Sequence, residues 1–185
     1  MRIRLAVAPA ALLLVLILIL AMVHLHMQKP STGEAPMHLV NSFDVDVRLP
    51  YAQAAPLFGP EGERAWAGDD WNPAFIHPRP AHDEEGAVFT VRHAHGKSVW
   101  VNTAFDVPGM HFQYVYFIAD KLVTTIDVRF TPLDAQDTKV HVTYARTALT
   151  AAANKHVQSM ADGDKKAGAE WQSAIDKYLA SLQQH

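Results

Sequence analysis

The sequence of 185 residues contains no cysteine. Disulfide bonds, thiol catalysis and thiolate metal sites are therefore excluded. Lysine and arginine form no large cluster, and the formal net charge of the chain is −3. This balance argues against nucleic acid as a partner, because phosphate binding depends on clustered positive charge. Serine is sparse and no Gly-x-Ser-x-Gly motif occurs, so a serine nucleophile is not expected either.

One long apolar run lies near the N-terminus. Residues 5–23 are all apolar, and as a helix they would extend roughly 28 Å, close to the thickness of a bilayer's hydrocarbon core. We interpret residues 1–27 as an uncleaved transmembrane anchor. A cleaved signal peptide is the alternative, although its apolar core would be shorter and the nearest small-residue site, Ser31-Thr32-Gly33, lies late.

The charges that flank this run predict its orientation. Arg2 and Arg4 precede the run and only Lys29 follows it closely, so the positive-inside rule places the N-terminus in the cytoplasm. The chain is then expected to be a single-pass protein of the inner (cell) membrane. Residues 28–38 would form a linker, and residues 39–185 a periplasmic or extracellular domain.

Short alternating segments predict an antiparallel sheet in that domain. Strands are expected at residues 40–49, 87–95, 98–106, 110–119, 122–130 and 139–147. Short turns join most of the later strands, which favours a meander of antiparallel neighbours. Residues 51–57 and 61–67 are each long enough for one or two helical turns.

A long amphipathic helix is predicted to close the chain at residues 163–184. Its large apolar side chains recur at spacings of three and four, at Ala167, Trp171, Ile175, Tyr178 and Leu182. A separate helix is expected over residues 150–161, with a break at Asp162-Gly163. Because an apolar face roughly 30 Å long needs a partner surface of matching length, we expect the sheet to receive this helix.

Several short motifs accompany these elements. They lie at residues 60–66 (Pro-Glu-Gly-Glu-Arg-Ala-Trp), 70–73 (Asp-Trp-Asn-Pro), 86–90, 142–144 and 147–150, at Trp171 and at Tyr178-Leu179. Over about residues 44–183 the chain resembles the SRPBCC, or START-like, superfamily, which includes polyketide cyclases and lipid-transfer domains. The resemblance implies an α+β helix-grip fold, an antiparallel sheet wrapped around a long C-terminal helix with a cavity between them. It implies no single activity, because this scaffold serves carriers and enzymes alike.

Strand alternation predicts which residues line the cavity. In the strand at 122–130 the apolar face holds Ile126, and a two-residue turn at Asp120-Lys121 would bring the side of the preceding strand that holds His111 onto the same face. Turns with an odd number of residues before the strands at 98–106 and 110–119 would bring residues of the two earlier strands onto the same face. The tryptophans of the short motifs and Tyr144 would complete the cavity wall. The expected lining is Trp66, Trp71, Phe89, Val101, Thr103, Phe105, His111, Gln113, Val115, Ile126, Tyr144 and Trp171.

Thr103, His111 and Gln113 would form the polar end of this apolar cavity. His111 is the one candidate for acid–base chemistry. The alternative is that His111 and Gln113 only bond each other or the backbone. Trp66 and Trp71 either cap the cavity mouth or pack the short helices onto the sheet.

The 11 histidines raise the question of a metal site. His93 and His95 would lie on one side of a strand, where a third ligand would complete a zinc site. The predicted register separates His93 from His111 by roughly 20 Å, while the loop residues His77 and His82 stay open as ligands. We expect no metal ion and no cofactor.

The same register leaves four aromatic residues on the outer face of the sheet, Trp100, Phe112, Tyr114 and Tyr116. A turn that differs by one residue from the predicted length would reverse this assignment. Otherwise they pack under loops or form a patch that faces a partner or a membrane.

Three functions are compatible with these features. The first is a membrane-tethered binding domain for a small hydrophobic or amphipathic ligand, lipid-like or polyketide-like, attached to the membrane through residues 5–23. The second is a cyclase-type enzyme that uses His111 in the same cavity. The third is a protein-interaction module with a filled core. A cavity of several hundred Å³ would favour the first two, and the sequence identifies neither the ligand nor a protein partner.

Overall fold

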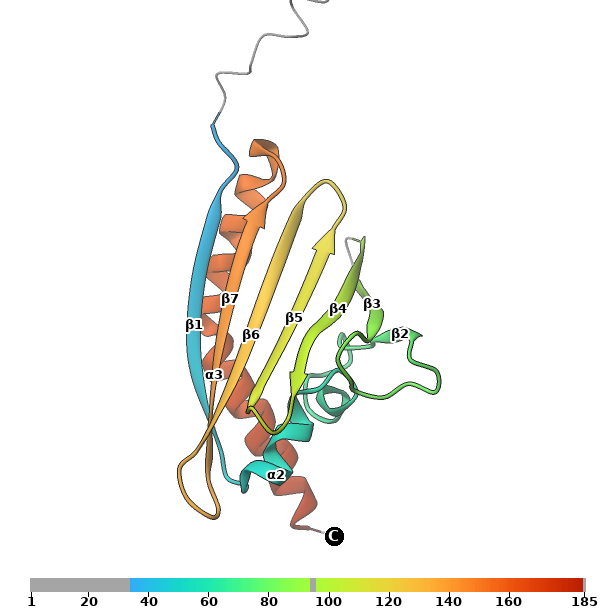
Figure 1. Ribbon diagram of the computed structural model, residues 1–185. Coiled ribbons are helices and arrows are strands. Elements are labelled where there is room, and N and C mark those ends of the chain that lie inside the picture. The colour runs from blue at the N-terminus through green and yellow to red at the C-terminus, as the bar shows by residue number, and fades with distance from the viewer. Residues whose placement is uncertain (1–33, 94–95, 185) are drawn as a thin grey trace, which may run out of the picture. The chain divides into compact units, whose positions relative to one another are not determined.

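The computed structural model describes residues 34–93 and 96–184. An antiparallel sheet of seven strands runs through them in the order β1-β7-β6-β5-β4-β3-β2 (Figure 1). The strands are β1 (His38–Val47), β2 (Ala74–His77), β3 (Val88–His93), β4 (Gly96–Asp106), β5 (His111–Ile118), β6 (Leu122–Pro132) and β7 (Thr138–Ala148). The first strand of the chain, β1, therefore pairs with the last strand of the chain, β7.

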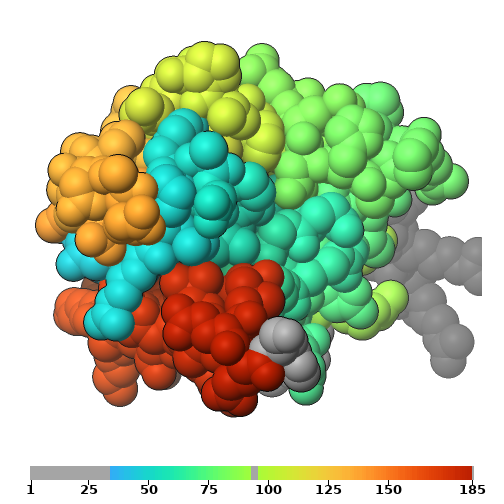
Figure 2. Space-filling model, turned by 90° about the horizontal axis from the view of Figure 1, so that it is seen from below, coloured from blue at the N-terminus to red at the C-terminus, as the bar shows by residue number. Residues whose placement is uncertain are grey.

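Short helices connect β1 to β2. They are α2 (Tyr51–Ala54) and the 3-10 turns η1 (Ala55–Phe58) and η2 (Gly62–Ala65). Gly62 permits η1 and η2 to fold tightly together, because a Cβ at this position would lie 1.8 Å from the carbonyl oxygen of Pro56. Figure 2 shows this segment, in cyan and teal, beside the C-terminal part of the chain, in red.

The chain ends in one long helix, α3 (Asn154–Leu182), which follows the 3-10 turn η3 (Ala151–Ala153). α3 packs chiefly against β1 and, to a lesser extent, against β7 (Figure 1). α3 approaches β1 closely at Gly168, where an added Cβ would lie 3.0 Å from the Cβ of Phe43. The helix thus lies over one side of the sheet.

Two details of the predicted helix are wrong. α3 continues through Asp162 and Gly163 without the predicted break, and Gly163 lies on an exposed side of the helix where its missing side chain costs no packing. The apolar stripe also ends earlier than predicted, since Leu182 is 56% exposed. A single exposed glycine weakens a helix by only about 1 kcal/mol, less than tertiary packing along its other face contributes.

The predicted α+β helix-grip arrangement is confirmed, and all six predicted strands occur near their predicted positions. The predicted membrane span at residues 5–23 lies outside the described residues. Within the described ranges, no helix combines the length and hydropathy that crossing a bilayer requires.

A buried ion pair joins α3 to the sheet. Arg146 on β7 donates from Nε and Nη2 to the two carboxylate oxygens of Asp164 on α3, at 2.8 and 2.5 Å. The two residues are only 5% and 7% exposed. Arg146 also donates to the hydroxyls of Tyr116 and Thr124, and its guanidinium lies 4.5 Å from the ring centre of Tyr144. This network fixes the position of α3 relative to the middle of the sheet.

We predict that Asp164→Asn destabilises the protein strongly. The substitution leaves the Arg146 charge buried without a counter-ion, which typically costs about 3 to 5 kcal/mol. Urea unfolding followed by circular dichroism measures the change. Asp162→Asn is the matched control, because Asp162 pairs with Lys165 on the exposed side of the same helix, and it should leave the midpoint close to that of the wild type. Equal midpoints for the two variants would show that the buried pair does not hold α3.

Candidate functional site

A cavity of about 360 Å³ lies between the sheet, the short helices and α3. The sheet contributes residues of β3 to β7, η2 and the loop after it contribute the wall nearest the short helices, and α3 closes the third side. The lining residues are Pro60, Glu63, Trp66, Ala67, Asp70, Trp71, Phe89, Trp100, Tyr114, Ile126, Val128, Tyr144, Glu170, Trp171 and Ala174. Most of this wall is aromatic or aliphatic.

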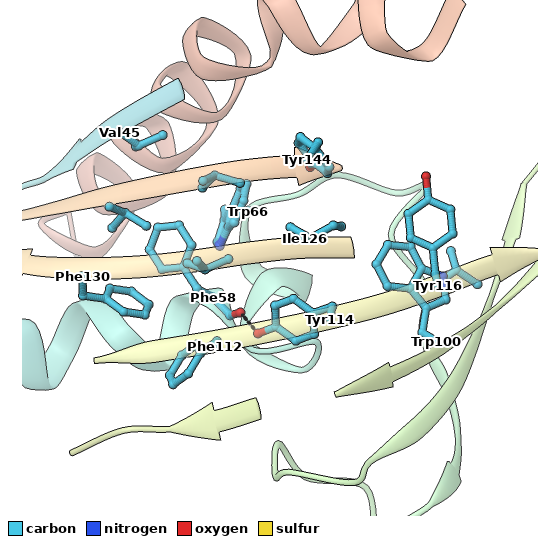
Figure 3. Packing of buried hydrophobic residues seen from close by; sticks show 14 of the residues in the cluster. Val45, Phe58, Trp66, Trp100, Phe112, Tyr114, Tyr116, Ile126, Phe130 and Tyr144 are labelled. Atoms are coloured by element: carbon cyan, nitrogen blue, oxygen red, sulfur yellow. Dashed lines mark hydrogen bonds between the residues drawn. The ribbon is translucent and has the colours of Figure 1, made fainter. Parts of the chain in front are cut away.

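Three polar atoms of the aromatic wall bond to the backbone of the short helices and the loop between them. The indole N–H groups of Trp66 and Trp71 donate to the carbonyl oxygens of Leu57 and Pro60, at 2.7 and 2.9 Å. The hydroxyl of Tyr114 donates to the carbonyl oxygen of Phe58 (Figure 3). These bonds hold the rings in place and leave their apolar surfaces toward the cavity.

A second hollow, of about 340 Å³, adjoins the first. The two share Trp71, Trp100, Ile126 and Tyr144 as wall residues. Trp100 stacks on Tyr116 with ring centres 4.2 Å apart (Figure 3). The two hollows therefore form neighbouring compartments along the inner face of the sheet.

The two compartments differ in the charge of their walls. The charged side chains that line the first compartment are all carboxylic acids, Glu63, Asp70 and Glu170. Those of the second are Lys121, Arg146 and His156, all basic. The acidic side chains thus line the first compartment and the basic ones the second, where Arg146 is paired with Asp164.

Glu63 is the most unusual polar residue of the site. It is 9% exposed, and its carboxyl group forms no hydrogen bond or ion pair within the described ranges. Asp83 accepts hydrogen bonds from the backbone N–H groups of Glu61 and Gly62 at 2.9 and 3.4 Å, and so fixes the start of the turn that carries Glu63. The carboxyl group therefore faces the cavity from a rigid position and without a protein partner.

Burial, and secondarily the negative charge of Asp83, raises the pKa of Glu63 well above its ordinary value of 4.5. Burial likewise raises the pKa of Tyr114 and of Tyr144. Both hydroxyls thus stay protonated at neutral pH. Glu63 is the group in this wall whose charge a change of surroundings can switch.

Six of the residues predicted to line the cavity surround it, Trp66, Trp71, Phe89, Ile126, Tyr144 and Trp171. The three tryptophans meet the core through ring contacts. Trp66 and Trp171 have ring centres 5.0 Å apart, and Trp71 lies edge-on to Trp100 at 5.3 Å. Trp66 and Trp71 therefore pack the short helices onto the sheet, as one interpretation predicted, and the same rings also line the cavity.

Five predicted lining residues lie on the outer face instead, Val101, Thr103, His111, Gln113 and Val115. The turn between β5 and β6 has three residues rather than two, since Ile118 pairs with Leu122. Asp120 within it has a positive φ of 59°, which an aspartate tolerates better than most residues. The extra residue shifts β5 by one position relative to β6 and reverses its faces.

The predicted polar group does assemble, but outside the cavity. His111 Nε2 lies 2.6 Å from Asp127 Oδ2, and Gln113 donates to the same oxygen at 3.3 Å. Thr103 donates to the side-chain oxygen of Gln113 at 3.0 Å. An acid–base role of His111 on a ligand in the cavity is therefore wrong.

The reversal also corrects the predicted outer aromatic patch. Trp100, Phe112, Tyr114 and Tyr116 are buried on the inner face, each no more than 7% exposed. Phe105 is on the inner side as predicted, because a β-bulge between Asn102 and Ala104 cancels the shift, and it stacks on Phe112 at 4.1 Å. It lies beyond the cavity wall.

Glu63 was not singled out from the sequence, although it lies within the 60–66 motif. Nothing in its neighbours distinguishes a buried glutamate from an exposed one. For the aromatic residues a signal existed, since Phe112, Tyr114 and Tyr116 alternate with His111 and Gln113. Hydrophobic alternation alone would have turned them inward.

No group of three potential ligands that could hold a metal ion occurs among the described residues. His77 and His82 each approach Glu84, at 3.6 and 3.0 Å. His95, one half of the His93-x-His95 pair, lies outside the described residues.

Comparison with known proteins identifies the fold. The sequence matches no protein-family model and no curated protein sequence. Norcoclaurine synthase from Thalictrum flavum, solved with dopamine and hydroxybenzaldehyde, is 8% identical, with a TM-score of 0.57 over 83% of this chain and 96% of that one. The fold is Bet v1-like. The chain thus shares with this synthase the helix-grip arrangement that the sequence motifs implied.

Two further solved structures support this assignment. BexL, a di-domain ARO/CYC protein from the BE-7585A biosynthetic pathway, is 9% identical, with a TM-score of 0.57 over 75% of this chain and 46% of BexL. A protein from Thermobifida fusca is 17% identical, with a TM-score of 0.54 over 75% of this chain and 92% of its own. Identities this low establish the shared fold, and the function has to be argued from the site.

We predict that the stability difference between the wild type and Glu63→Gln changes with pH. A carboxyl group whose pKa is raised on folding stabilises the fold while it is protonated, and this contribution is lost as pH rises above the unfolded-state value. The wild type should therefore lose stability relative to Glu63→Gln from about pH 4.5 upward, until Glu63 ionises in the folded state. Thermal unfolding between pH 4 and pH 8 measures this.

Glu85→Gln is the control for the loss of one carboxylate, because Glu85 is exposed. Its melting temperature should follow that of the wild type at every pH. A constant difference between the wild type and Glu63→Gln over the whole range would show that Glu63 is not desolvated.

Proposed function

We propose that the helix-grip domain binds one small hydrophobic or amphipathic organic molecule between the inner face of its sheet and α3. The observation that carries this proposal is the cavity of about 360 Å³, with aromatic walls and the buried carboxyl group of Glu63, which has no partner among the described residues. Small-molecule sites are typically apolar hollows of about 300 to 1,000 Å³ with a few polar groups. This cavity has that composition and lies at the lower end of that size range.

Two further observations support a ligand-binding role. A filled core would leave no such space, so the volume disfavours a purely structural interaction module. Norcoclaurine synthase, which has the same fold, was solved in complex with dopamine and hydroxybenzaldehyde. A carrier or sensor of a lipid-like or polyketide-like molecule requires no chemical step beyond this binding.

The proposal includes a location for the domain. Residues 5–23 would anchor the chain in the cell membrane, and the two arginines before them favour a cytoplasmic N-terminus. The domain would then act on the outer side of that membrane. A hydrophobic ligand could exchange there between the bilayer and the cavity.

A cyclase-type enzyme is the second candidate, and Glu63 is the observation that favours it. A carboxyl group with a raised pKa can donate or accept a proton near neutral pH. The hydroxyl of Tyr144 lines the same cavity. Glu63 thus takes the acid–base role that the sequence had suggested for His111.

We predict that filling the cavity abolishes binding of a neutral hydrophobic probe. Ala174→Phe places a ring from α3 into the cavity, and the fluorescence increase of N-phenyl-1-naphthylamine with the purified full chain should fall to that of a protein-free blank. Ala67→Leu, from the opposite wall, should weaken probe binding in the same direction.

Ala169→Phe is the matched control, because Ala169 lies on the exposed side of the same helix. This variant should bind the probe like the wild type. Circular dichroism confirms that each variant is folded before binding is compared. Equal probe binding by Ala174→Phe, Ala67→Leu and the wild type would contradict the proposed cavity.

The membrane location predicts two results. An alkaline phosphatase fused after residue 185 should be active, because that enzyme folds only outside the cytoplasm, and the chain should stay in the membrane fraction after a carbonate wash. Deletion of residues 5–23 should release it to the soluble fraction. A soluble, shortened form of the intact gene product that begins near residue 34 would show a cleaved signal peptide instead.

A further inference from the structure

The unpaired carboxyl group of Glu63 points to the chemistry of the ligand. Nine-tenths of this residue is buried, and buried polar groups nearly always have a partner. Three polar groups of its wall already have theirs, since Trp66, Trp71 and Tyr114 donate to backbone carbonyls. None of their donors is therefore available to Glu63, and the position in front of its carboxylate is open to a donor from a bound molecule.

The charge of the wall indicates what kind of donor fits. Glu63, Asp70 and Glu170 all line this compartment, and among the described residues no lysine, arginine or histidine lines it. An anionic group would be repelled there, while a cationic donor would bond to a carboxylate more strongly than a neutral one. The basic groups lie in the adjoining compartment.

The aromatic rings add a second attraction for a cation. The indoles of Trp66, Trp71 and Trp171 line the same compartment as Glu63, together with the ring of Tyr144. Tryptophan is the aromatic side chain with the strongest attraction for cations, and the effect grows when water is excluded. Aromatic rings around a carboxylate form a common type of site for organic ammonium groups.

We propose that the ligand carries a basic nitrogen, and that its ammonium group binds at Glu63 between the indoles of Trp66, Trp71 and Trp171. This inference rests on the proposed ligand-binding function and specifies the class of molecule. The apolar part of the ligand lies against Trp100, Ile126 and Val128. A hydrophobic or arylalkyl amine has this combination of groups.

Binding of an amine should also release a proton. Burial beside Asp83 raises the pKa of Glu63 in the free protein, and a bound ammonium group opposes that rise because it favours the carboxylate. The titratable groups around Glu63 are Asp83, Asp70, Glu170, Tyr114 and Tyr144. Below the pKa of free Glu63, each ammonium that binds therefore displaces about one proton to the buffer.

The test compares three indoles that differ in one terminal group. Tryptamine has an ammonium group, tryptophol a hydroxyl and indole-3-propionate a carboxylate. Calorimetric titration of the purified full chain, with a protein-free blank, should show tryptamine binding about tenfold or more tightly than tryptophol, as expected for one charge-assisted hydrogen bond. Indole-3-propionate should bind the acidic compartment most weakly.

Variants distinguish Glu63 from the general charge of the site. Glu63→Gln should remove the preference for tryptamine and leave the affinity for tryptophol within about twofold, because the shape of the wall is unchanged. Glu170→Gln changes an exposed carboxyl at the edge of the same cavity, and should reduce tryptamine binding by only about threefold or less. Titrations in two buffers of different ionisation enthalpy should show proton release with the wild type and none with Glu63→Gln.

Two kinds of failure are distinguishable. If tryptamine binds no better than tryptophol, or keeps its preference in Glu63→Gln, the inference about the amine is wrong while the cavity still binds ligands. Absence of tryptamine binding overturns the inference whatever the other probes do. If N-phenyl-1-naphthylamine also fails to bind the wild type, the proposed function itself is wrong.

Discussion

The position of α3 over one side of the sheet determines most of the remaining structure. The helix packs against β1 and β7, where Gly168 allows close approach to Phe43 and the Arg146–Asp164 pair fixes its register. The inner faces of β4 to β6 therefore receive little cover from α3. Their large side chains need another cover to be removed from water. The short helices after β1 supply it on one side only, and the uncovered remainder is the cavity.

The aromatic walls of this cavity need hydrogen-bond acceptors, because tryptophan and tyrosine each bring a polar N–H or O–H group into an apolar space. The backbone of residues 57–60 provides acceptors for three of these atoms. The same short segment thus covers the sheet and satisfies the rings that it covers. Glu63 follows directly after that segment and has no such acceptor or donor. A buried carboxyl group with no partner among the described residues gives the cavity a defined chemical preference.

The sequence was sufficient for the architecture and for about half of the site. Alternation along β6 placed Ile126 on the inner face, and the spacing of apolar residues identified α3, because both patterns repeat over many residues. The faces of β5 depended on the length of one turn, and a single residue at Ala119 reversed them. The bulge in β4 could not be seen in the pattern either. Long periodic signals average over local irregularities, whereas a register depends on every one of them.

Glu63 illustrates a different limit of prediction from the sequence. Glu63 lines the same cavity as Tyr114 on β5 and Trp171 on α3, and no sequence-local pattern encodes the meeting of residues that are so far apart in the chain. A glutamate in a helical turn is most often a solvated residue. Only the three-dimensional arrangement shows that this one is desolvated and unpaired.

The pairing of β1 with β7 has a consequence for how the chain folds. His38 and Thr147, which bond across this pair, are 109 residues apart, and α3 packs on the same first strand. β3 to β6 can form as a local meander, but β1 has no partner until the last strand has been synthesised. Contacts over such sequence separations slow folding, because a long loop must close before they form. We therefore expect the final step of folding to be the docking of β1 and α3 onto a preformed meander, so that the cavity exists only once the whole chain has folded.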